Sequence, residues 1–445
     1  MTDEQERRSI LEVSRDDNLL VALRDLRAGE QIEWGDKVVA IAEDIPAKHK
    51  VAACDLCVGD SAFMYGVLVG EATKPIARGR RITTDNLVHR SSDYGQSRSE
   101  RSWTPPSVGQ WEGHSFQGFH RKDGSVGTAN HWLVVPMVFC ENGNIETLKN
   151  SMLDALGFQR RNQYQLFARE LAEVYSDGLD PDSVSLQAEQ DHSPSPIFPN
   201  VDGIKFISHG LGCGETRGIS EELCGLLAGY ACNPNVGGIT VLSLGCQHAQ
   251  VSILEKEISK RIPGFDKPLF VFEQHKFDSE REMLERAIRR TFKGLAEINL
   301  LQRSPAPLSK LCLGMECGAS DGFSGISANP TMGRVADLLV ALGGRIILSE
   351  FPELCGVEQE IVNRCDQAET GDRFIEIMRN YEARVKEAGS GFHMNPSPGN
   401  VRDGLITDAI KSAGAARKGG TSPINDVLDY PGWITRDGLS LLCTA

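Results

Sequence analysis

The sequence predicts an α/β protein with a largely parallel sheet, preceded by a small β-rich module. Up to residue 92, short apolar segments alternate with Gly and Pro, as in Lys37–Ile41 and Met64–Leu68, a pattern typical of short strands joined by tight turns. From residue 114 onward, apolar strand-like segments alternate with helical ones, as in α/β architectures. These changes divide the chain into a β-rich module (1–92), a Ser- and Pro-rich linker (93–113) and an α/β region in two halves (114–300 and 301–445).

Apolar runs and helical periodicity place the main elements of the α/β region. The predicted strands are Trp132–Val138, Gly203–Ser208, Gly238–Leu244, Pro268–Phe272, Leu308–Met315 and Arg345–Leu348. The predicted helices are Ser220–Tyr230, Ser279–Ile298, Val335–Leu342, Val357–Arg364 and Asp372–Glu387. Because helices separate successive strands, the strands are expected to run parallel in an open sheet.

Length and charge limit the classes of function. A chain of 445 residues exceeds one ordinary core, so two or three domains are expected. The net charge of −14 argues against nucleic-acid and anionic-membrane partners, although local Arg and Lys side chains can still bind an anionic small molecule. No apolar run is long enough to span a bilayer, and the charged N-terminus lacks a signal core. We therefore expect a cytoplasmic protein that acts on a small-molecule substrate. A homo-oligomer is compatible with these features.

Reactive side chains follow five of the predicted strands. The segments are His209-Gly-Leu-Gly-Cys213, Gly245-Cys246-Gln-His248, Glu273-Gln-His275, Glu316-Cys317-Gly-Ala-Ser320-Asp321 and Ser349-Glu350-Phe-Pro-Glu353. Ligands of open parallel sheets bind beyond the carboxyl ends of the strands. These segments are therefore expected to gather at a single edge and to form one ligand site.

Cys213, Cys246 and Cys317 are the most specific members of this set. The chain has 12 cysteines, which in a reducing compartment are expected to be thiols or ligands rather than disulfides. Each of the three follows a strand next to glycine, so three thiolates could hold Fe(II) or an iron–sulfur cluster with one open coordination position. Two alternatives stay open: buried thiols at tight turns, or a harder ion, Mn(II) or Mg(II), held by oxygen ligands.

Histidines and glutamates at the same strand ends suit acid–base chemistry. Elimination of water from a hydroxy acid needs a base for the proton α to the carboxylate and an acid for the departing β-hydroxyl. A cation or strong donor must also stabilise the enolate-like intermediate. We take His209, Glu350 and Glu353 as candidate catalytic residues. His248 and His275 are further imidazoles at strand ends, and any one of these histidines could instead be structural.

A late polar segment supplies candidate ligands for an anionic polyol. An NPSPGN turn and the basic run after it contribute Asn395, Ser397, Asn400, Lys411, Ser412 and Lys418. Amides, hydroxyls and cationic side chains held near Pro and Gly can bind a carboxylate and its neighbouring hydroxyl groups. The alternative is a solvated turn followed by an exposed basic helix end.

These stretches resemble the altronate/galactarate dehydratases, a family of sugar-acid hydro-lyases, over nearly the whole chain. The motifs that carry the resemblance span 118–130, 209–214, 244–246, 317–321, 324–330, 350–353 and 395–428. The resemblance implies a carbon–oxygen lyase that converts altronate to 2-keto-3-deoxygluconate in hexuronate breakdown, with galactarate as the second choice of substrate. Within the motifs, it assigns substrate binding to Arg121, Ser320, Asp321 and Asn329.

The N-terminal module resembles the family's SAF domain, a β-clip fold that closes over the active site in related enzymes. Its signature is Asp44-Ile-Pro-Ala-Lys-His49-Lys50, followed by Tyr65-Gly66 and Asn86. The resemblance implies that His49 and Lys50 act in catalysis and that Asn86 reaches the substrate or metal. The alternative is that His49 and Lys50 cap a surface loop.

The chain departs from the family pattern at two places. Many relatives carry His-x-His-Asn where this chain has Thr83-Thr-Asp85-Asn86, so two histidines are not available and Asp85 would favour a harder ion. Relatives also continue past the equivalent of Cys443, which favours a C-terminally shortened form.

Competing functions differ in their products. A lyase of the same fold could expel sulfite from a sulfolactate, and a catalytically impaired protein could bind a sugar acid without turning it over. A nucleotide-binding oxidoreductase is disfavoured, because no G-x-G-x-x-G follows a strand and opens a helix with an acidic residue ~20 positions later.

Overall fold

The computed structural model describes residues 9–94, 102–159, 163–186, 195–316, 318 and 320–444. The chain forms two compact units. The first unit combines Met1–His114 with Pro307–Ala445, and the second unit is Ser115–Ala306. The division near residue 306 lies close to the predicted division of the α/β region, but the structure joins its second half to the N-terminal module in one unit.

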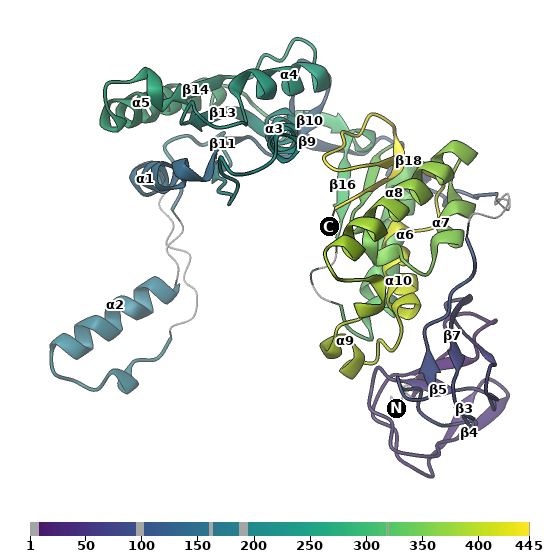
Figure 1. Ribbon diagram of the computed structural model, residues 1–445. Coiled ribbons are helices and arrows are strands. Elements are labelled where there is room, and N and C mark those ends of the chain that lie inside the picture. Colours follow the sequence, from purple (N-terminus) through teal and green to yellow (C-terminus); the bar gives the residue numbers. More distant parts are fainter. Residues whose placement is uncertain are drawn as a thin grey trace. The chain divides into compact units, whose positions relative to one another are not determined.

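The N-terminal module of the first unit is built from short antiparallel strands (Figure 1). Its strands are β1 (Ile10–Leu11), β2 (Leu19–Ala22), β3 (Gln31–Trp34), β4 (Lys37–Ala40), β5 (Lys50–Ala52), β6 (Ser61–Met64), β7 (Val67–Ala72) and β8 (Leu87–Val88). They pair as β1-β2-β5, β3-β4 and β6-β7-β8. All four side chains of β2 are buried, so this strand lies in the interior of the module.

A four-stranded parallel sheet completes the first unit, with the order β16-β17-β19-β18. Its strands are β16 (Cys312–Met315), β17 (Arg345–Leu348), β18 (Ile424–Leu428) and β19 (Gly438–Leu442). The helices of this part are α6 (Ala328–Ala341), α7 (Glu358–Arg364), α8 (Ala368–Glu387), α9 (Pro398–Arg402) and α10 (Asp408–Ala416). One hydrophobic core joins buried side chains of this sheet, its helices and the N-terminal module. The module and the C-terminal sheet are therefore packed as one body.

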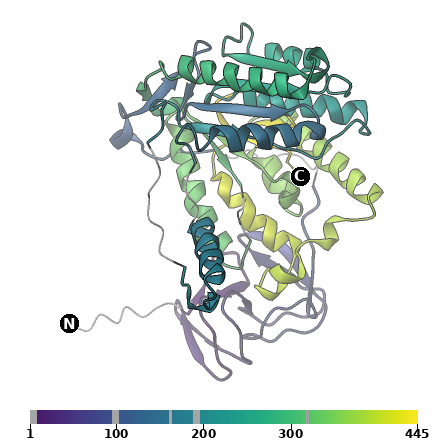
Figure 2. The same cartoon turned by 90° about the vertical axis from the view of Figure 1, so that its left-hand side faces the viewer.

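The second unit holds another four-stranded parallel sheet, with the order β12-β11-β13-β14. Its strands are β11 (His131–Pro136), β12 (Gly203–Phe206), β13 (Val236–Ser243) and β14 (Leu269–Glu273). Its helices are α1 (Asn142–Met152), α2 (Gln163–Ser176), α3 (Arg217–Cys232), α4 (Val251–Arg261) and α5 (Glu280–Ile298). Figure 2 shows the helices that pack around the sheet from a second side. A small sheet of order β10-β9-β15 adds β9 (Ser115–His120), β10 (Val126–Gly127) and β15 (Ser304–Pro307), and its β9 and β10 are antiparallel.

Trp132 is the centre of the core in the second unit. Its side chain is fully buried, and its indole N–H donates to Thr240 Oγ1 at 3.0 Å. A Cβ on Gly238 would lie 2.3 Å from the Trp132 ring, and one on Gly294 would lie 2.1 Å from it. Glycine at these two positions therefore lets the neighbouring strand and α5 close on the ring.

The predicted fold class is confirmed, because each predicted strand corresponds to a strand of the structure and the two four-stranded sheets of the α/β region are parallel. The expectation that the reactive strand ends share a single sheet edge is wrong. Four-stranded sheets lie in both units, and each has its own core. In the described part of the chain, no helix is long and apolar enough to cross a membrane.

Candidate functional site

Glu350 and Lys418 form an ion pair at the carboxyl end of β17. Glu350 follows the strand closely and has a left-handed backbone with φ of 65°, which is unusual for a non-glycine residue and often marks a functional position. Its backbone N–H donates to Thr444 Oγ1 at 2.9 Å. Lys418 Nζ lies 2.5 Å from Glu350 Oε2, and only 1% of the lysine side chain is exposed. The protein therefore buries a cation next to a fixed carboxylate.

Glu353 lies between two ammonium groups. Its Oε1 is 2.9 Å from Lys411 Nζ, and its Oε2 is 3.9 Å from Lys418 Nζ. Oε2 is buried and accepts no hydrogen bond from the described residues. Coulomb attraction is strong where water is scarce, so two carboxylates alternate with two cations in a site that keeps one acceptor oxygen available.

Asn395 holds Lys411 from the other side. Its Oδ1 accepts a hydrogen bond from Lys411 Nζ at 3.1 Å, and its Nδ2 donates to Asp408 Oδ1 at 3.0 Å. Asp408 is 4% exposed at the start of α10. Because Asn395 donates to a carboxylate, its carbonyl oxygen must face the lysine.

A second cluster joins the N-terminal module to the C-terminal region. Lys48 Nζ lies 3.3 Å from Asp321 Oδ2 and 3.2 Å from Asp403 Oδ2. Hydrogen bonds that Lys48 donates to Asp403 and to Asp321 raise its pKa, with Asp403 the larger cause. Burial acts to raise the pKa of Asp321. The backbone N–H groups of residues 323 and 324 and the ammonium group of Lys48 outweigh this effect, so the pKa of Asp321 is lowered overall. Asp321 and Asp403 thus fix a charged loop of the module.

His49 and Lys50 lie beside that cluster. His49 Nε2 is 3.0 Å from Arg402 O, whereas its buried Nδ1 has no hydrogen-bond partner among the described residues. Burial lowers the pKa of His49, so the ring is neutral at pH 7, with Nε2 as the donor to the carbonyl and Nδ1 as a free acceptor. Burial also lowers the pKa of Lys50 to about 7, although Asp321 opposes this shift.

Lys50 makes hydrogen bonds that hold two backbone segments together. Its fully buried Nζ donates to Lys48 O at 3.0 Å and to Gly404 O at 2.7 Å. Gly404 has φ of 88°, and a Cβ there would lie 2.5 Å from Lys48 O. The loop of the N-terminal module therefore packs directly against the backbone of residue 404, and Lys50 is hydrogen-bonded to both segments.

Ser320 and Asn400 connect the two clusters. Asn400 Nδ2 donates to Ser320 O at 3.0 Å, and Ser397 caps α9 by accepting from Asn400 N at 3.3 Å. Ser320 and Lys411 both line a small cavity of about 10 Å³, which Tyr65 of β6–β7 also lines. The candidate site of the first unit therefore includes side chains from the N-terminal module, β17, the turn after β16 and α10.

The predicted residues of the second unit form a separate group. Desolvation and then the electrostatic effect of Cys246 raise the pKa of Cys213, so the two thiols are neighbours. Cys140 also acts electrostatically on Cys213. His209 Nε2 lies 3.0 Å from Pro136 O, its Nδ1 accepts from the Leu211 N–H at 3.2 Å, and burial lowers its pKa. Both ring nitrogens of His209 are thus used to hold the turn after β12.

Three domain families match consecutive parts of this chain. The altronate/galactarate dehydratase SAF domain matches residues 8–90, the second domain of D-galactarate dehydratase/altronate hydrolase matches 118–299, and the C-terminal domain of D-galactarate/altronate dehydratase matches 308–445. The chain belongs to the altronate/galactarate dehydratase family. Its N-terminal module is the SAF domain of this family.

Similar proteins include enzymes of this family and one other lyase. Altronate dehydratase of Bacillus subtilis is 29% identical over 98% of this chain and 78% of its own length. Galactarate dehydratase (L-threo-forming) of Escherichia coli is 28% identical over 98% of this chain and 76% of its own length. The beta subunit of (2R)-sulfolactate sulfo-lyase from Chromohalobacter salexigens is 25% identical over 74% of this chain and 71% of its own length.

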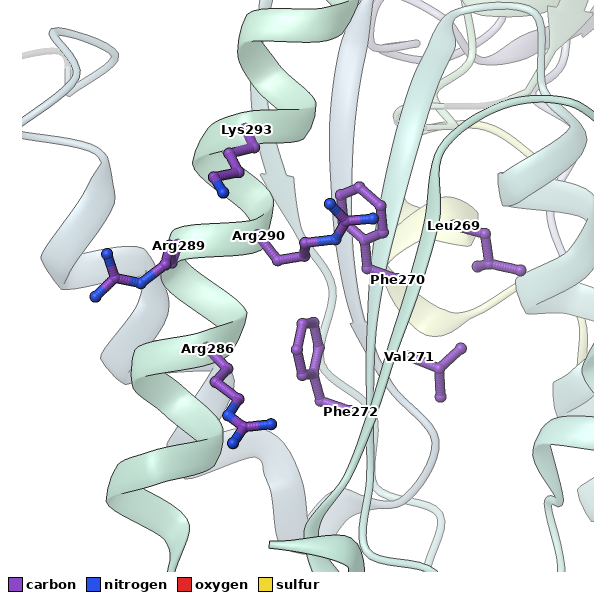
Figure 3. Close-up of a pocket in the computed structure, with 8 residues that line it drawn as sticks. All are labelled: Leu269, Phe270, Val271, Phe272, Arg286, Arg289, Arg290 and Lys293. Atoms are coloured by element: carbon purple, nitrogen blue, oxygen red, sulfur yellow. The ribbon is translucent and has the colours of Figure 1, made fainter.

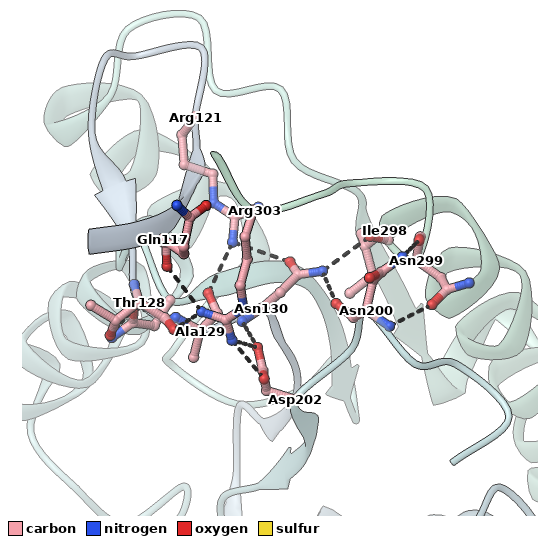
Figure 4. Close-up of polar contacts among 11 residues, drawn as sticks. Gln117, Arg121, Thr128, Ala129, Asn130, Asn200, Asp202, Ile298, Asn299 and Arg303 are labelled. Carbon is pink, nitrogen blue, oxygen red and sulfur yellow. Dashed lines mark hydrogen bonds and ion pairs between the residues drawn. The ribbon is translucent and has the colours of Figure 1, made fainter. Parts of the chain in front are cut away.

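In this member of the dehydratase family, Arg121 forms hydrogen bonds within the second unit (Figure 4). Its guanidinium donates to Pro234 O at 2.9 Å and to Asn130 Oδ1 at 3.1 Å. Asn130 is fully buried and donates in turn to Asn200 O and Ile298 O. These contacts hold the segment before β11. Arg121 belongs to the second unit, whereas the Glu350–Lys418 pair belongs to the first.

Three further residues that were predicted to bind the substrate lie in the first unit. Asn86 closes a turn of the SAF domain, because its Oδ1 accepts from Thr83 N and its Nδ2 donates to Arg81 O. Asn329 is 5% exposed and donates to Gly414 O at 3.0 Å. Ser412 is fully buried, and its hydroxyl has no hydrogen-bond partner in the described part of the chain. Their substrate-binding roles stay predictions.

The predicted three-cysteine metal site is incomplete in the part of the chain that is described. Cys317 lies outside the described residues, and Cys213 and Cys246 supply two neighbouring thiols in the second unit. No group of three or more His, Cys, Asp or Glu side chains that could hold a metal ion occurs among the described residues. These residues alone therefore do not form a metal site.

A basic pocket in the second unit does not contain the predicted site residues (Figure 3). It measures about 400 Å³ and lies between β14 and α5. The side chains that line it are Leu269, Phe270, Val271, Phe272, Arg286, Arg289, Arg290 and Lys293. Arg290 stacks over Phe270 at 4.4 Å from the ring centroid, so part of this positive charge covers the edge of the sheet.

Sequence reasoning missed several members of the site. Lys48 directly precedes the predicted His49, and its position between two carboxylates was not expected. Asp403 and Asp408 follow the NPSPGN turn, and as acidic residues near helix ends they resemble ordinary capping groups. Charge density gives no local signal, because six of the 24 residues from 395 to 418 are charged, about the same share as the 24% of the whole chain.

Proposed function

We propose that this chain is a dehydratase that removes water from a sugar acid, with altronate as the preferred substrate and galactarate as the second. The names of the similar dehydratases support the substrate class. The observation that carries the proposal is the position of Glu353, whose carboxylate contacts Lys411 and faces Lys418 at the carboxyl end of β17. This arrangement combines a base, an acid and two cations for an anionic substrate.

Glu353 and Lys411 provide a closed path for protons. The C–H bond α to the substrate carboxylate breaks, and its proton passes to Glu353 while the electron pair forms an enolate. The β C–O bond then breaks, and Lys411 gives a proton to the departing oxygen, which leaves as water. A proton returns from Glu353 to Lys411 across their 2.9 Å contact. The resulting enol tautomerises to a 2-keto-3-deoxy acid, which from altronate is 2-keto-3-deoxygluconate.

Lys418 and Glu350 prepare the site for negative charge. Lys418 is nearly fully buried, so it attracts a substrate carboxylate and the developing enolate more strongly than an exposed lysine would. Glu350 balances this cation when the site holds no substrate. Fixed charges of this kind lower the barrier because they need no reorganisation during the reaction.

The SAF domain contributes His49 to the same proposal. Its Nδ1 is a free acceptor, which suits a hydrogen bond from a hydroxyl group of the sugar acid. Lys50 then acts by position, because it binds the backbone of both the SAF loop and residue 404. Ser320, Asp321, Asn395, Ser397 and Asn400 remain proposed substrate-binding residues around this loop.

The proposal includes a divalent metal, with Fe(II) first and Mn(II), Mg(II) or an iron–sulfur cluster as alternatives. A bound cation would act as a Lewis acid on the substrate carboxylate or the departing hydroxyl. Cys213 and Cys246, which act on each other electrostatically, are the proposed ligands together with Cys317. The proton transfers between Glu353 and Lys411 do not depend on which ion is bound.

A panel of substrates tests the proposed function. The purified chain is incubated without oxygen with altronate, galactarate, other aldonates or sulfolactate, each with Fe(II), Mn(II) or Mg(II), and both 2-keto acid and sulfite are measured. The proposal expects 2-keto-3-deoxy acid, most rapidly from altronate. Release of sulfite in its place would support a sulfo-lyase, the second candidate, which the 25% identity to a sulfolactate sulfo-lyase subunit favours. Binding of altronate without any product would identify a non-catalytic sugar-acid-binding protein.

A further inference from the structure

A hydrogen-bonded path leads from Lys411 to the buried carboxyl group of Asp408. Lys411 donates to Asn395, and Asn395 donates to Asp408. Glu358 also acts electrostatically on Asp408. Glu358 is 4% exposed, and its Oε2 accepts from the Gly356 N–H at 2.7 Å. Two buried carboxyl groups therefore influence each other at the end of this path.

Burial disfavours a full negative charge on this pair of carboxyl groups. Asp408 and Glu358 are each 4% exposed, and the charge of Glu358 adds to the effect of burial in raising the pKa of Asp408. Two buried carboxylates repel each other, which favours one shared proton.

The surroundings of Asp408 give it few ways to hold a full charge. The titratable or charged groups that face it are Cys355, Glu358 and Lys411. His89 accepts from the Ala409 N–H through Nδ1 at 3.3 Å, and burial lowers its pKa, so it is neutral at pH 7. Glu382 of α8 adds negative charge on the Glu358 side. Lys411 is therefore the cation that responds most directly to the charge on Asp408.

We propose that Asp408 is a positioning residue that sets the acidity of Lys411 through Asn395. With a neutral carboxyl at Asp408, Lys411 gives up its proton more readily, as the proposed acid must. With an ionised carboxylate, the ammonium ion is stabilised and becomes a weaker acid. The catalytic meaning of this control rests on the proposed function, whereas the electrostatic coupling of the two residues does not.

The coupling between Asp408 and Lys411 is expected to act near neutral pH. Burial raises the pKa of Asp408 to about 7, although the charge of Lys411 and the hydrogen bond from Asn395 oppose this shift. Below this value the carboxyl is neutral and Lys411 is the stronger acid. Above it, the carboxylate forms and the acidity of Lys411 falls.

Chemical labelling of Lys411 tests the coupling without relying on catalysis. The full chain is exposed to trace acetic anhydride across an alkaline pH series, and acetylation of Lys411 is measured by mass spectrometry relative to exposed Lys293. Asp408→Asn and Asp408→Ser both remove the charge, and two variants guard against a folding defect in either. Asp437→Asn is the matched control, because Asp437 pairs with Arg345 at the surface.

The expected result is a midpoint for Lys411 labelling that lies lower in both Asp408 variants, by on the order of one pH unit. Asp437→Asn should leave the midpoint unchanged. Equal midpoints in wild type and both Asp408 variants would overturn the inference, as would an equal shift in the Asp437 control.

Activity provides the second readout. The ratio of kcat for Asp408→Asn to that of wild type should be close to one at pH 6 and should rise above pH 7, to at most about tenfold. A loss of activity that is the same at every pH would show a purely structural role and would overturn the inference. A labelling shift in a protein that dehydrates no sugar acid would instead reject the proposed function while the coupling stands.

Discussion

Lys411 Nζ and Glu353 Oε1 lie 2.9 Å apart, although the two residues belong to elements that are distant in the chain. Glu353 lies in η7 (Phe351–Leu354), just after β17, and Lys411 lies in α10. The pair is mostly buried, with 12% of the lysine and 19% of the glutamate side chain exposed. A contact between an acid and a base at this depth allows a proton to pass without entering bulk water.

Lys50→Met should destabilise the first unit, and more so at high pH. The variant leaves Lys48 O and Gly404 O without their buried donor, which costs about 1–3 kcal/mol in unfolding free energy at pH 9. In wild type, the folded pKa of about 7 lies below the ordinary 10.5. The unfolded chain therefore binds more protons between these values, and wild-type stability rises with pH across that window.

Chemical unfolding at pH 6 and pH 9 checks this prediction. The difference between wild type and Lys50→Met should be larger at pH 9, because at pH 6 the wild type must bury an ammonium charge. Lys74→Met, at an exposed position of the same module, is the control and should change little. An identical difference at both pH values would show that Lys50 is not buried in the folded state.

Asp408→Asn should remove a pH dependence of stability. The folded pKa of about 7 lies above the ordinary 3.8, so the folded protein binds more protons than the unfolded chain between these values. Wild-type stability should therefore fall as pH rises from about 4 to 7, by up to about 1.4 kcal/mol per pH unit. Unfolding of both proteins at several pH values measures the effect. A constant difference between them across this window would contradict it.

Cys213→Ala and Cys246→Ala should each lower the amount of iron that the protein retains. The two thiols are near enough to act on each other electrostatically, and a bound cation would convert them to thiolates. Iron is measured by mass spectrometry after anaerobic loading with Fe(II) and desalting, so the readout does not depend on activity. Cys57→Ala, an exposed cysteine of the SAF domain, is the control. Wild-type iron content in both variants would remove this thiol pair from the metal proposal.

Much of the fold is predictable because the central parallel strands β11 and β13 are buried along nearly their whole length. All eight residues of β13 are buried, and the corresponding run stands out in the sequence. The start of α5 is equally clear, since Ser279 accepts a hydrogen bond from Glu282 N as an N-cap. Local periodicity and capping are properties of neighbouring residues, so they can be recognised without knowing the tertiary contacts.

The grouping of the strands could not be obtained in this way. β19 inserts between β17 and β18, and this order depends on packing between segments that are remote in the chain. For the same reason the sequence suggests one edge for Cys213 and Glu350, whereas their strands belong to different sheets. Asp408 was missed because a buried carboxyl cannot be distinguished from a helix-capping one without its partners Asn395 and Cys355.

The fate of the proton at C2 of altronate tests the central claim most directly. The rate of 2-keto acid formation from C2-deuterated and unlabelled altronate is compared in wild type and in Glu353→Gln, with Glu376→Gln, an exposed surface carboxylate paired with Arg373, as the control. Loss of the base should slow turnover by about 10²–10⁴-fold while altronate still binds, and wild type and the control should show a primary isotope effect. Turnover by Glu353→Gln within a few fold of wild type would contradict the assignment of Glu353 as the base.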